Sequence, residues 1–494
     1  MQVGFDNQLY IQKQTEKILE RIESFHNKLY LEFGGKLFDD FHAARVLPGF
    51  DLNGKVKLLT TLKDKAEIIF CIKAGDIEKN KIRADIGITY DMDVLRLIDK
   101  LRNLGLLVNS VVITQYEEQE AADLFRQRLE RRGVKTYTHR HTKGYPSEID
   151  LIVSDKGYGM NPYIKTSRPL VVVTAPGPGS GKLATCLSQL YHEHKRNNVA
   201  GYAKFETFPV WNLPLKHPVN MAYEAATSDL NDVNMIDPFY LEAYGKTAVN
   251  YNRDIDAFPI VRAMLTKITG NKDFYRSPTD MGVNMAGYAI VDDEACSKAA
   301  RQEVIRRYYS AECDYKKGLV SAECLQKNVM LLKQLELSEN DRSVVEPALE
   351  KAQKEGVPVA AIELPDGSIV TGKKTELMNS VSSMLLNAIK QLAGIADEIR
   401  LISPIVLEPI LRLKKNALME PDPILNIEDV LIALSISAAT NPTAEVAMSK
   451  LVKLAGCEMH STCMLMQADE SVLKKLKINL TCEPVFPTDD LYYV

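Results

Sequence analysis

Short apolar runs alternate with amphipathic stretches through residues 56–208. These runs have the length and β-branched content of strands, and they cover residues 67–73, 108–114, 134–139, 148–154 and 169–175. Between them, residues 91–105 and 117–133 carry apolar side chains at helical spacing and end in glycine. Repeated strand–helix units of this kind predict a mostly parallel sheet covered by helices on both faces.

The second half of the chain follows a different pattern. Residues 229–355 contain several helical segments and few β-branched runs, which predicts a mainly helical region. From residue 356 strands and helices alternate again, and a hairpin signal, Pro-Asp-Gly at 365–367, separates the first two predicted strands. A long helix ending at Gly394, a strand over 398–404, two helices and a closing strand, helix and strand complete the predicted order.

The fold class that follows is α/β, with room in 494 residues for about three domains of roughly 150 residues each. We expect an N-terminal α/β domain at 1–228, with a mostly parallel sheet and a P-loop-like turn. A mainly helical middle domain at 229–355 and a C-terminal α/β domain at 356–494 complete the expected organisation.

The sequence VVVTAPGPGSGKLAT (171–185) joins an apolar run to a helical one through a Gly/Pro-rich loop. Phosphate-binding loops use glycines because backbone N–H groups must approach the anion closely, in conformations that side chains forbid. The following helix adds the amides and dipole of its N-terminus, and a lysine reaches the outer phosphates. The residues that we predict to bind the ligand are Gly177, Gly179, Ser180, Gly181, Lys182 and Thr185.

Two positions depart from the G-x-x-x-x-G-K-[ST] pattern of nucleotide triphosphatases. Pro176 occupies the first glycine position, and Leu183 stands where a hydroxyl would bind magnesium. Thr185 lies about 200° around the helix from Leu183 and is a poor substitute. The loop therefore predicts an anion site more strongly than a magnesium-dependent triphosphate site. ATP or another phosphorylated ligand fits it, the magnesium requirement stays open, and a glycine turn with an exposed lysine is the structural alternative.

Other polar segments provide candidates for the rest of a site. The turn-rich stretch 273–287 contains Arg276, Asp280 and Asn284, which we predict as catalytic residues that complete the site across a domain cleft. A capped inter-domain loop is the alternative interpretation. Asp292 and Asp293 follow an apolar run in the manner of a Walker B strand, although they equally suit a helix N-terminus.

Composition limits the partners and the location of the protein. Lys and Arg number 61 against 65 for Asp and Glu, and the net charge of -4 argues against a nucleic-acid partner. The N-terminus has no apolar core of a signal peptide, and no window holds 18 uncharged apolar residues, so we expect no membrane span. The 8 cysteines lack paired spacing, which indicates reduced thiols and a cytoplasmic protein. A homo-oligomer is as compatible with the sequence as a monomer.

Several segments together resemble one bacterial family, domain of unknown function family 1846, also called uncharacterised protein family 0371. The segments are VVVTAPGPGSGK, LATCLSQLYHE, RSPTDMGVNMAGYAIVDDE, PDGSIVTGK and GCEMHST, and the resemblance covers essentially the whole chain. It implies a cytoplasmic bacterial protein with a larger N-terminal region and a separate C-terminal α/β domain. It implies no reaction and no catalytic residues.

Members of this family have also been labelled ATP-dependent zinc proteases, a label that the histidine spacing can test. The protease motif H-E-x-x-H places two histidines four residues apart on one helix face. Here His192 and His194 are two residues apart, about 200° around a helix, so they cannot hold one zinc ion together. The sequence therefore predicts that the protein is not a zinc protease of this type.

Two functional hypotheses follow from the loop. The first is an enzyme that acts on a nucleotide or a phosphorylated small metabolite at Gly177–Lys182, with phosphoryl transfer or hydrolysis as the favoured chemistry. The second is a regulatory protein that senses such a ligand without turning it over. An enzyme needs carboxylates such as Asp280, Asp292 and Asp293 beside the loop, whereas a sensor does not.

Overall fold

The computed structural model describes residues 3–83, 86–420 and 423–488, and the chain divides into two compact units. The N-terminal unit extends to Glu224 and also includes Asp232–Ala300, and the C-terminal unit consists of Ala225–Asn231 and the residues from Arg301 onward. The predicted domain boundaries near residues 228 and 355 stay predictions.

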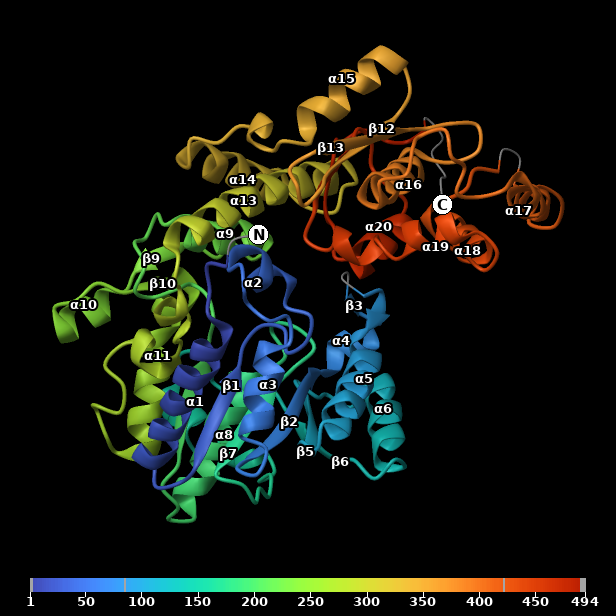
Figure 1. Cartoon of the computed structure of the whole chain (residues 1–494). Coiled ribbons are helices and arrows are strands. Elements are labelled where there is room, and N and C mark those ends of the chain that lie inside the picture. The colour runs from blue at the N-terminus through green and yellow to red at the C-terminus, as the bar shows by residue number, and fades with distance from the viewer. Residues whose placement is uncertain (1–2, 84–85, 421–422, 489–494) are drawn as a thin grey trace. The chain divides into compact units, whose positions relative to one another are not determined.

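A parallel seven-stranded sheet forms the centre of the N-terminal unit, as the sequence predicts (Figure 1). All neighbouring strands pair in parallel. In spatial order the strands are β11 (Gly282–Val283), β8 (Gly201–Phe205), β1 (Leu29–Phe33), β7 (Leu170–Thr174), β2 (Ala66–Lys73), β5 (Leu107–Thr114) and β6 (Lys135–His139). The α/β fold class is thereby confirmed for this unit.

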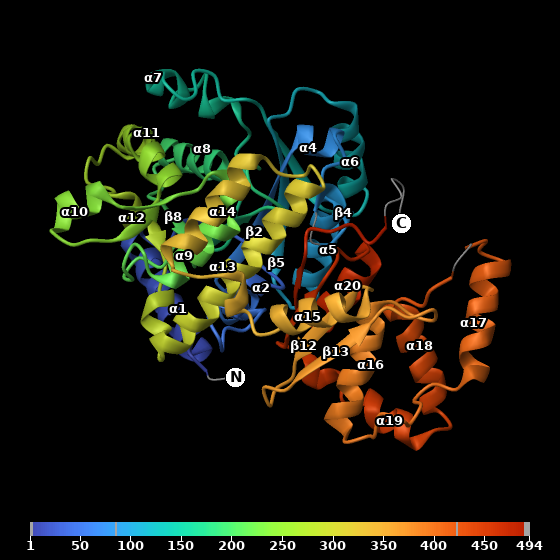
Figure 2. The ribbon, with the colours of Figure 1, turned by 90° about the horizontal axis from the view of Figure 1, so that it is seen from above.

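Helices cover both faces of this sheet because its connections run in two directions. The chain passes from β1 to β2, β5 and β6 in one direction, through α3 (Gly54–Thr61), α5 (Tyr90–Asn103) and α6 (Glu120–Glu130). It passes from β7 to β8 and β11 in the other, through α8 (Lys182–Lys195) and α11 (Asn252–Thr269). Right-handed crossovers place these two helix sets on opposite faces (Figures 1 and 2). In such sheets ligands bind beyond the carboxyl ends of the strands, where the direction reverses.

The face covered by α8 and α11 holds a buried aliphatic and aromatic core. Tyr30 of β1, Val173 of β7 and Tyr202 of β8 pack there against Leu187 of α8 and Phe258 of α11. Side chains alternate between the faces of a strand, so residues two positions further along continue on this same face. This alternation brings charged residues of β1 and β8 to the same face, just beyond the core.

The sequence-based strand assignments are correct for β2, β5, β6 and β7, but two assignments are wrong. Residues 148–154 contain the short helix α7 (Ile149–Ile152) and pair with no strand, because Ile149 and Ile152 suit one helix face and Ile152 is buried. The neighbours of β7 are therefore β1 and β2. Residues 398–403 form turns and bends that lead into α17 (Pro404–Asn416), whose first residue is a proline.

The remaining elements of the N-terminal unit frame this sheet. They are α1 (Asn7–Ser24), α2 (Phe41–Val46), α4 (Ala74–Glu78), β3 (Ile82–Arg83), β4 (Ile88–Thr89), α9 (Pro218–Ala226), β9 (Asn234–Ile236), α10 (Pro238–Tyr244), β10 (Val249–Tyr251) and α12 (Pro278–Met281). The last residues of α9 belong to the C-terminal unit. No helix of the described residues is long and apolar enough to span a membrane.

The C-terminal unit combines helices with a mixed four-stranded sheet. Its helices are most of α13 (Asp293–Lys316), then α14 (Ala322–Gln334), α15 (Val345–Glu355), α16 (Ser380–Ala393), α17, α18 (Ile427–Ala438), α19 (Pro442–Met448) and α20 (Gln467–Lys475). Its strands are β13 (Ile369–Lys373), β12 (Val359–Glu363), β14 (Glu458–Ser461) and β15 (Asn479–Cys482), in spatial order. The predicted hairpin is β12–β13, and the predicted closing strand, helix and strand are β14, α20 and β15.

Candidate functional site

The glycine loop, residues 175–181, joins the end of β7 to the start of α8, so the predicted strand–loop–helix order is present. Gly181 is the N-cap residue of α8 and has φ 79°, a conformation that L side chains rarely adopt. No side chain caps this helix, in contrast to α1, where Asp6 accepts two backbone N–H groups. The N–H groups of the first turn of α8 are therefore available to an anion.

The glycine loop is held in place by residues of α5 and β5. A Cβ at Gly177 would lie 2.4 Å from the hydroxyl oxygen of Tyr90, so only glycine allows this contact. The hydroxyl of Ser180 donates to the carbonyl oxygen of Gly177 at 2.8 Å, and Thr114 Oγ1 donates to the carbonyl oxygen of Ser180 at 2.9 Å. Ser180, predicted as a ligand-binding residue, is thus buried and engaged within the loop.

Lys182 begins α8 and Lys73 ends the neighbouring strand β2, and neither has a counter-ion among the described residues. Lys182 is the first residue of the helix and Lys73 is the last residue of β2, and both are half-buried. Within the described residues neither ammonium group has a hydrogen bond or an ion pair. Cys71 donates its thiol to Thr185 Oγ1 at 3.4 Å, which shows that this face of β2 packs against the first turn of α8. Lys73 is two residues beyond Cys71 and lies on the same face.

The pKa shifts of two buried thiols, Cys71 and Cys186, show which charged residues lie near them. Burial raises the pKa of the Cys71 thiol to about 12, Lys182 opposes that shift, and Glu32 of β1 adds to it. The pKa of the Cys186 thiol is likewise raised well above its usual value by burial, then by Glu32. Lys182 and Glu32 therefore both lie close enough to these buried thiols to affect their pKa.

A second set of charged residues, which we call the Lys204 cluster, comprises Lys204, Glu206, Tyr251 and Asp254. Lys204 of β8 is in register with Glu32 of β1, and its ammonium lies 2.8 Å from Glu206 Oε1. The same ammonium group donates to the Asp254 carboxylate and the Tyr251 hydroxyl oxygen. Only 14% of the Lys204 side chain and 5% of the Glu206 side chain are exposed.

The Lys204 cluster perturbs the proton affinity of its members. Burial lowers the pKa of Lys204, but Asp254 and Glu206 together hold it well above its usual value. Burial raises the pKa of Glu206 to about 7, and Lys204 opposes this shift while Asp254 adds to it, in part through a side-chain hydrogen bond. A buried carboxyl group with a pKa near neutrality is typical of a group that transfers protons.

The predicted catalytic residues lie apart from the glycine loop. Asp280 belongs to α12, which leads into β11, three strand positions from β7 and thus about 14 Å away at roughly 4.8 Å per strand. Its carboxylate accepts from the Tyr244 hydroxyl at 2.9 Å and from the backbone N–H of Arg276 at 3.1 Å. Asn284 follows β11 and donates to the carbonyl oxygen of Pro209 at 2.9 Å. The catalytic role of these residues stays a prediction that no contact with the loop supports.

Asp292 and Asp293 also have partners elsewhere. Asp292 Oδ1 accepts from the backbone N–H of Ala295 at 3.0 Å, and Asp293 lies 3.1 Å from His217 Nε2. The carboxyl groups of Glu32, Glu206 and Asp254, which sequence reasoning missed, lie at the carboxyl ends of β1 and β8 or contact Lys204 there. The available signal was KFE at 204–206, charged residues at the end of a short strand followed by a turn.

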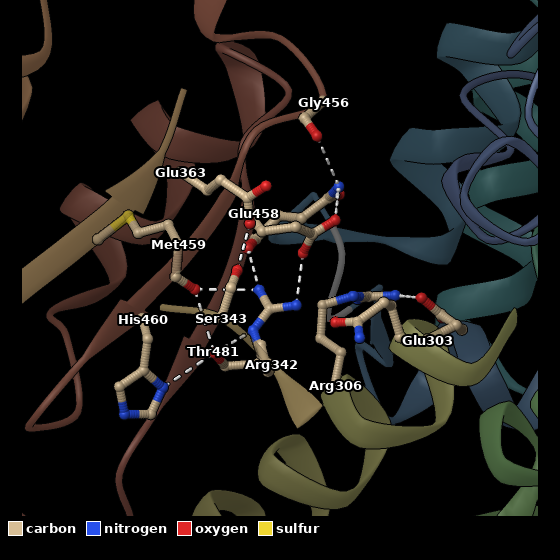
Figure 3. A network of polar contacts seen from close by, with 12 residues as sticks. Glu303, Arg306, Arg342, Ser343, Glu363, Gly456, Glu458, Met459, His460 and Thr481 are labelled. Carbon is tan, nitrogen blue, oxygen red and sulfur yellow. Dashed lines mark hydrogen bonds and ion pairs between the residues drawn. The ribbon is translucent and has the colours of Figure 1, made fainter. Parts of the chain in front are cut away.

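The C-terminal unit contains the polar network drawn in Figure 3, which is centred on the buried residue Arg342. Arg342 Nε donates to Thr481 Oγ1 at 2.9 Å, and the Nη groups donate to Glu458 and to the carbonyl oxygens of Met459 and Asn479. All of these acceptors belong to β14 and β15. Arg342 therefore fastens two neighbouring strands together, a structural role.

His460 belongs to the same network. Its Nδ1 lies 3.0 Å from Thr481 Oγ1 and its Nε2 lies 3.1 Å from Glu483 Oε1. Burial lowers the pKa of His460, an effect that Glu483 opposes. Both ring nitrogens face groups of the same unit and the residue is fully buried, which favours the core role.

The histidines of α8 have separate environments. His192 Nε2 lies 2.7 Å from the carbonyl oxygen of Asn161, whereas His194 Nε2 lies 3.4 Å from that of Ala200. In the part of the chain that the structure describes, no three His, Cys, Asp or Glu side chains are grouped so as to hold a metal ion.

Fold and site together define the N-terminal unit as a doubly wound α/β structure with a rigid glycine loop and buried charges beyond the carboxyl ends of its strands. The chain belongs to the family described as domain of unknown function DUF1846. The N-terminal model of that family matches residues 3–336 and the C-terminal model matches residues 340–492. The resemblance noted in the sequence is thereby confirmed.

The chain is similar to curated proteins of clostridia. A UPF0371 protein of Clostridium botulinum (strain Alaska E43 / Type E3) is 58% identical over 100% of both chains. A UPF0371 protein of Clostridium tetani (strain Massachusetts / E88) is also 58% identical over 100% of both chains. These names state a bacterial family of uncharacterised proteins and no reaction.

Proposed function

We propose that the N-terminal unit binds a small phosphorylated molecule, a nucleotide or a phosphorylated metabolite, at the glycine loop, and that the protein is an enzyme that acts on it. The observation that carries the proposal is that Lys182, at the uncapped N-terminus of α8, and Lys73, at the end of the neighbouring strand β2, are half-buried with no counter-ion among the described residues. Two ammonium groups and a helix N-terminus match the two negative charges of a phosphate group.

The glycine loop suits this role because its shape does not depend on the ligand. Tyr90 and Thr114 fix it from neighbouring elements, so little conformational freedom is lost when an anion binds. Leu183 in the place of the usual hydroxyl removes one magnesium ligand. The loop thus favours recognition of a phosphate by amides and lysines alone.

A regulatory protein that senses the ligand without turnover would use the same loop. The Lys204 cluster favours the enzyme, because a sensor has no need of a buried carboxyl group whose pKa burial raises to about 7.

Calorimetric titration of the full chain with inorganic phosphate, ADP and ATP, with and without magnesium, tests the proposal. We expect Lys182→Ala to weaken binding of every phosphate compound about tenfold or more, the effect of losing one charge-assisted hydrogen bond. Lys79→Ala removes an exposed lysine just beyond α4 and serves as the matched control. Binding that Lys182→Ala leaves unchanged, or no heat with any phosphate compound, would overturn the proposal.

A further inference from the structure

Helix α17 lies at the edge of the C-terminal unit, where one of its faces packs against α18 (Figure 2). Leu407 and Lys414 of this face are buried, and the ammonium group of Lys414 lies 2.9 Å from Asp429 Oδ2 of α18. Residues 407 and 414 are about two helical turns apart, so together they fix which face of α17 is turned inward. The same spacing identifies the residues of the outward face.

The outward face of α17 exposes large apolar side chains. Ile405 is 80% exposed and Leu413 is 55% exposed, and the exposed residue Pro409 lies between them at spacings of four residues. Just beyond the helix, Leu418 and Met419 are exposed as well. A single exposed apolar side chain is ordinary, but a continuous run along one helix face is typical of a surface that contacts another molecule.

Three charged residues border this apolar run. Glu408, Arg412 and Lys415 are exposed, and none of them has an ion pair within the described residues. At 3.6 residues per turn, Glu408 and Lys415 lie within about 20° of one another on one side of the outward face, whereas Leu413 lies on the other side. The outward face therefore presents apolar side chains together with unpaired charges of both signs.

We propose that α17 is a dimerisation helix, which pairs in the antiparallel direction with α17 of a second copy of the chain. A two-fold axis at the level of Ile410 and Leu411 makes every contact reciprocal. In that register Glu408 of each copy lies within one helical turn of Arg412 and Lys415 of the second copy. Each copy thus supplies the counter-ions that the other lacks, and the apolar side chains are buried between the two helices.

The arrangement of the charges favours this partner and this direction. In an antiparallel pair related by a two-fold axis, equivalent sides of the two helices meet, so Glu408 faces Lys415 twice, once from each copy. In a parallel pair opposite sides meet, and Glu408 would face the side that bears Leu413. An anionic membrane surface would attract Arg412 and Lys415, but it would repel the carboxylate of Glu408.

The length of α17 sets the strength of the pairing. Its 13 residues form a helix about 20 Å long at roughly 1.5 Å per residue. Two such helices bury less than the roughly 1,600 Å² of a standard stable interface, so we expect a weak and reversible dimer. Because the charged residues lie at the exposed border of the interface, high salt should weaken the dimer further.

Sedimentation equilibrium of the full chain over a wide concentration range tests the proposal. We expect the unmodified chain to dimerise reversibly, and Leu413→Ser and Glu408→Lys each to raise the dissociation constant about tenfold or more. Adding Lys415→Glu to Glu408→Lys exchanges the two charges and should restore most of the affinity. Leu319→Ser, which changes an apolar side chain that is also exposed between α13 and α14, is the matched control. Thermal unfolding checks that each variant is folded.

Cysteine cross-linking tests the direction of the pairing. The 8 native cysteines are all buried, so an exposed cysteine introduced on α17 reacts alone. In the antiparallel register residue 405 lies opposite residue 416 of the second copy, and about 16 Å along the helix axis from residue 405 of that copy. Under a mild oxidant, a mixture of Ile405→Cys and Asn416→Cys should therefore form a disulfide between chains, whereas neither variant alone should.

The outcomes are distinct. A dimer that Leu413→Ser and Glu408→Lys weaken, and that cross-links only in the mixture, supports the proposal. A chain that stays monomeric at every concentration, a dimer that both variants leave intact, or Ile405→Cys chains that cross-link with one another would overturn it. Flotation with phosphatidylglycerol vesicles that Leu413→Ser abolishes would identify a membrane surface as the partner instead. None of these outcomes depends on phosphate binding, so the dimer and the phosphate site are tested separately.

Discussion

The hydroxyl of Thr114 donates a hydrogen bond to the carbonyl oxygen of Ser180 at 2.9 Å. This contact fastens the glycine loop, which follows β7, to the end of β5, two strand positions away. Both groups are buried, so the carbonyl oxygen has no access to water if the hydroxyl is lost. The shape of the loop therefore depends on a residue 66 positions away in sequence.

Thr114→Val should destabilise the N-terminal unit and weaken phosphate binding. The substitution keeps the shape of the side chain but leaves the Ser180 carbonyl oxygen without a donor, a loss of about 1–3 kcal/mol. Urea denaturation measures this loss. Thr138→Val, on the edge strand β6, is the matched control and should change stability little. Equal effects of the two variants would show that the Thr114 hydrogen bond is unimportant.

Gly181→Ala should destabilise the protein more than Gly133→Ala. Both glycines have positive φ, 79° and 71°, so each alanine meets the same backbone strain of about 1–2 kcal/mol. A Cβ at Gly181 would also lie 2.9 Å from Thr114, whereas nothing lies within 4 Å of one at Gly133. The difference between the free energies of unfolding of the two variants, measured from denaturation curves, gives the steric effect of the contact with Thr114. Phosphate titration should show weaker binding only for Gly181→Ala.

Arg342→Lys should destabilise the C-terminal unit by about 1–3 kcal/mol, because lysine keeps the charge beside Glu458 but leaves buried acceptors without a donor. A lysine cannot supply the fork of donors that reaches Thr481, Glu458 and two carbonyl oxygens. Arg400→Lys, at an exposed position, is the control. The backbone amides of β14 and β15 should exchange hydrogen faster in the Arg342 variant. Unchanged protection of these amides would contradict the role of Arg342 in joining the two strands.

The stability of the N-terminal unit should fall as pH rises from about 4.5 to about 7, in part through Glu206. Its pKa is raised in the folded state from 4.5 to about 7, so within this range the folded state binds more protons than the unfolded state and loses stability as they dissociate. In the Glu206→Gln variant the free energy of unfolding should decrease less over this pH range, by an amount on the order of 2 kcal/mol. Denaturation at several pH values measures the free energy of unfolding, and Glu78→Gln, which changes an exposed glutamate of α4, is the control. If Glu206→Gln leaves the pH dependence unchanged, Glu206 is not the group that titrates in this range.

The sequence predicts the glycine loop well because its signals are local. An apolar strand, closely spaced glycines and a helical stretch follow one another within residues 170–195, and the structure has β7, the loop and α8 there. The prediction for residues 148–154 was wrong, since a short helix such as α7, in which Ile152 is buried, and a short strand have similar apolar composition.

The Lys204 cluster could not be predicted, because it depends on strand order. β1 and β8 contain Glu32 and Lys204, whose charges obscure the apolar pattern of a buried strand. Their register across the sheet, and the arrival of Asp254 from α11, arise only when distant segments pack together. Asp280 is polar and turn-associated in the sequence, yet its partners are Tyr244 and the backbone of Arg276.

The most direct test of the central claim is a titration of inorganic phosphate into four proteins at low ionic strength. These are the unmodified chain, Lys73→Ala, Lys182→Ala and the double variant. If both lysines bind the same anion, each single substitution weakens binding about tenfold and the double variant binds no phosphate measurably. Phosphate affinity that is absent from the unmodified chain, or that survives in the double variant, would contradict an anion site at the N-terminus of α8.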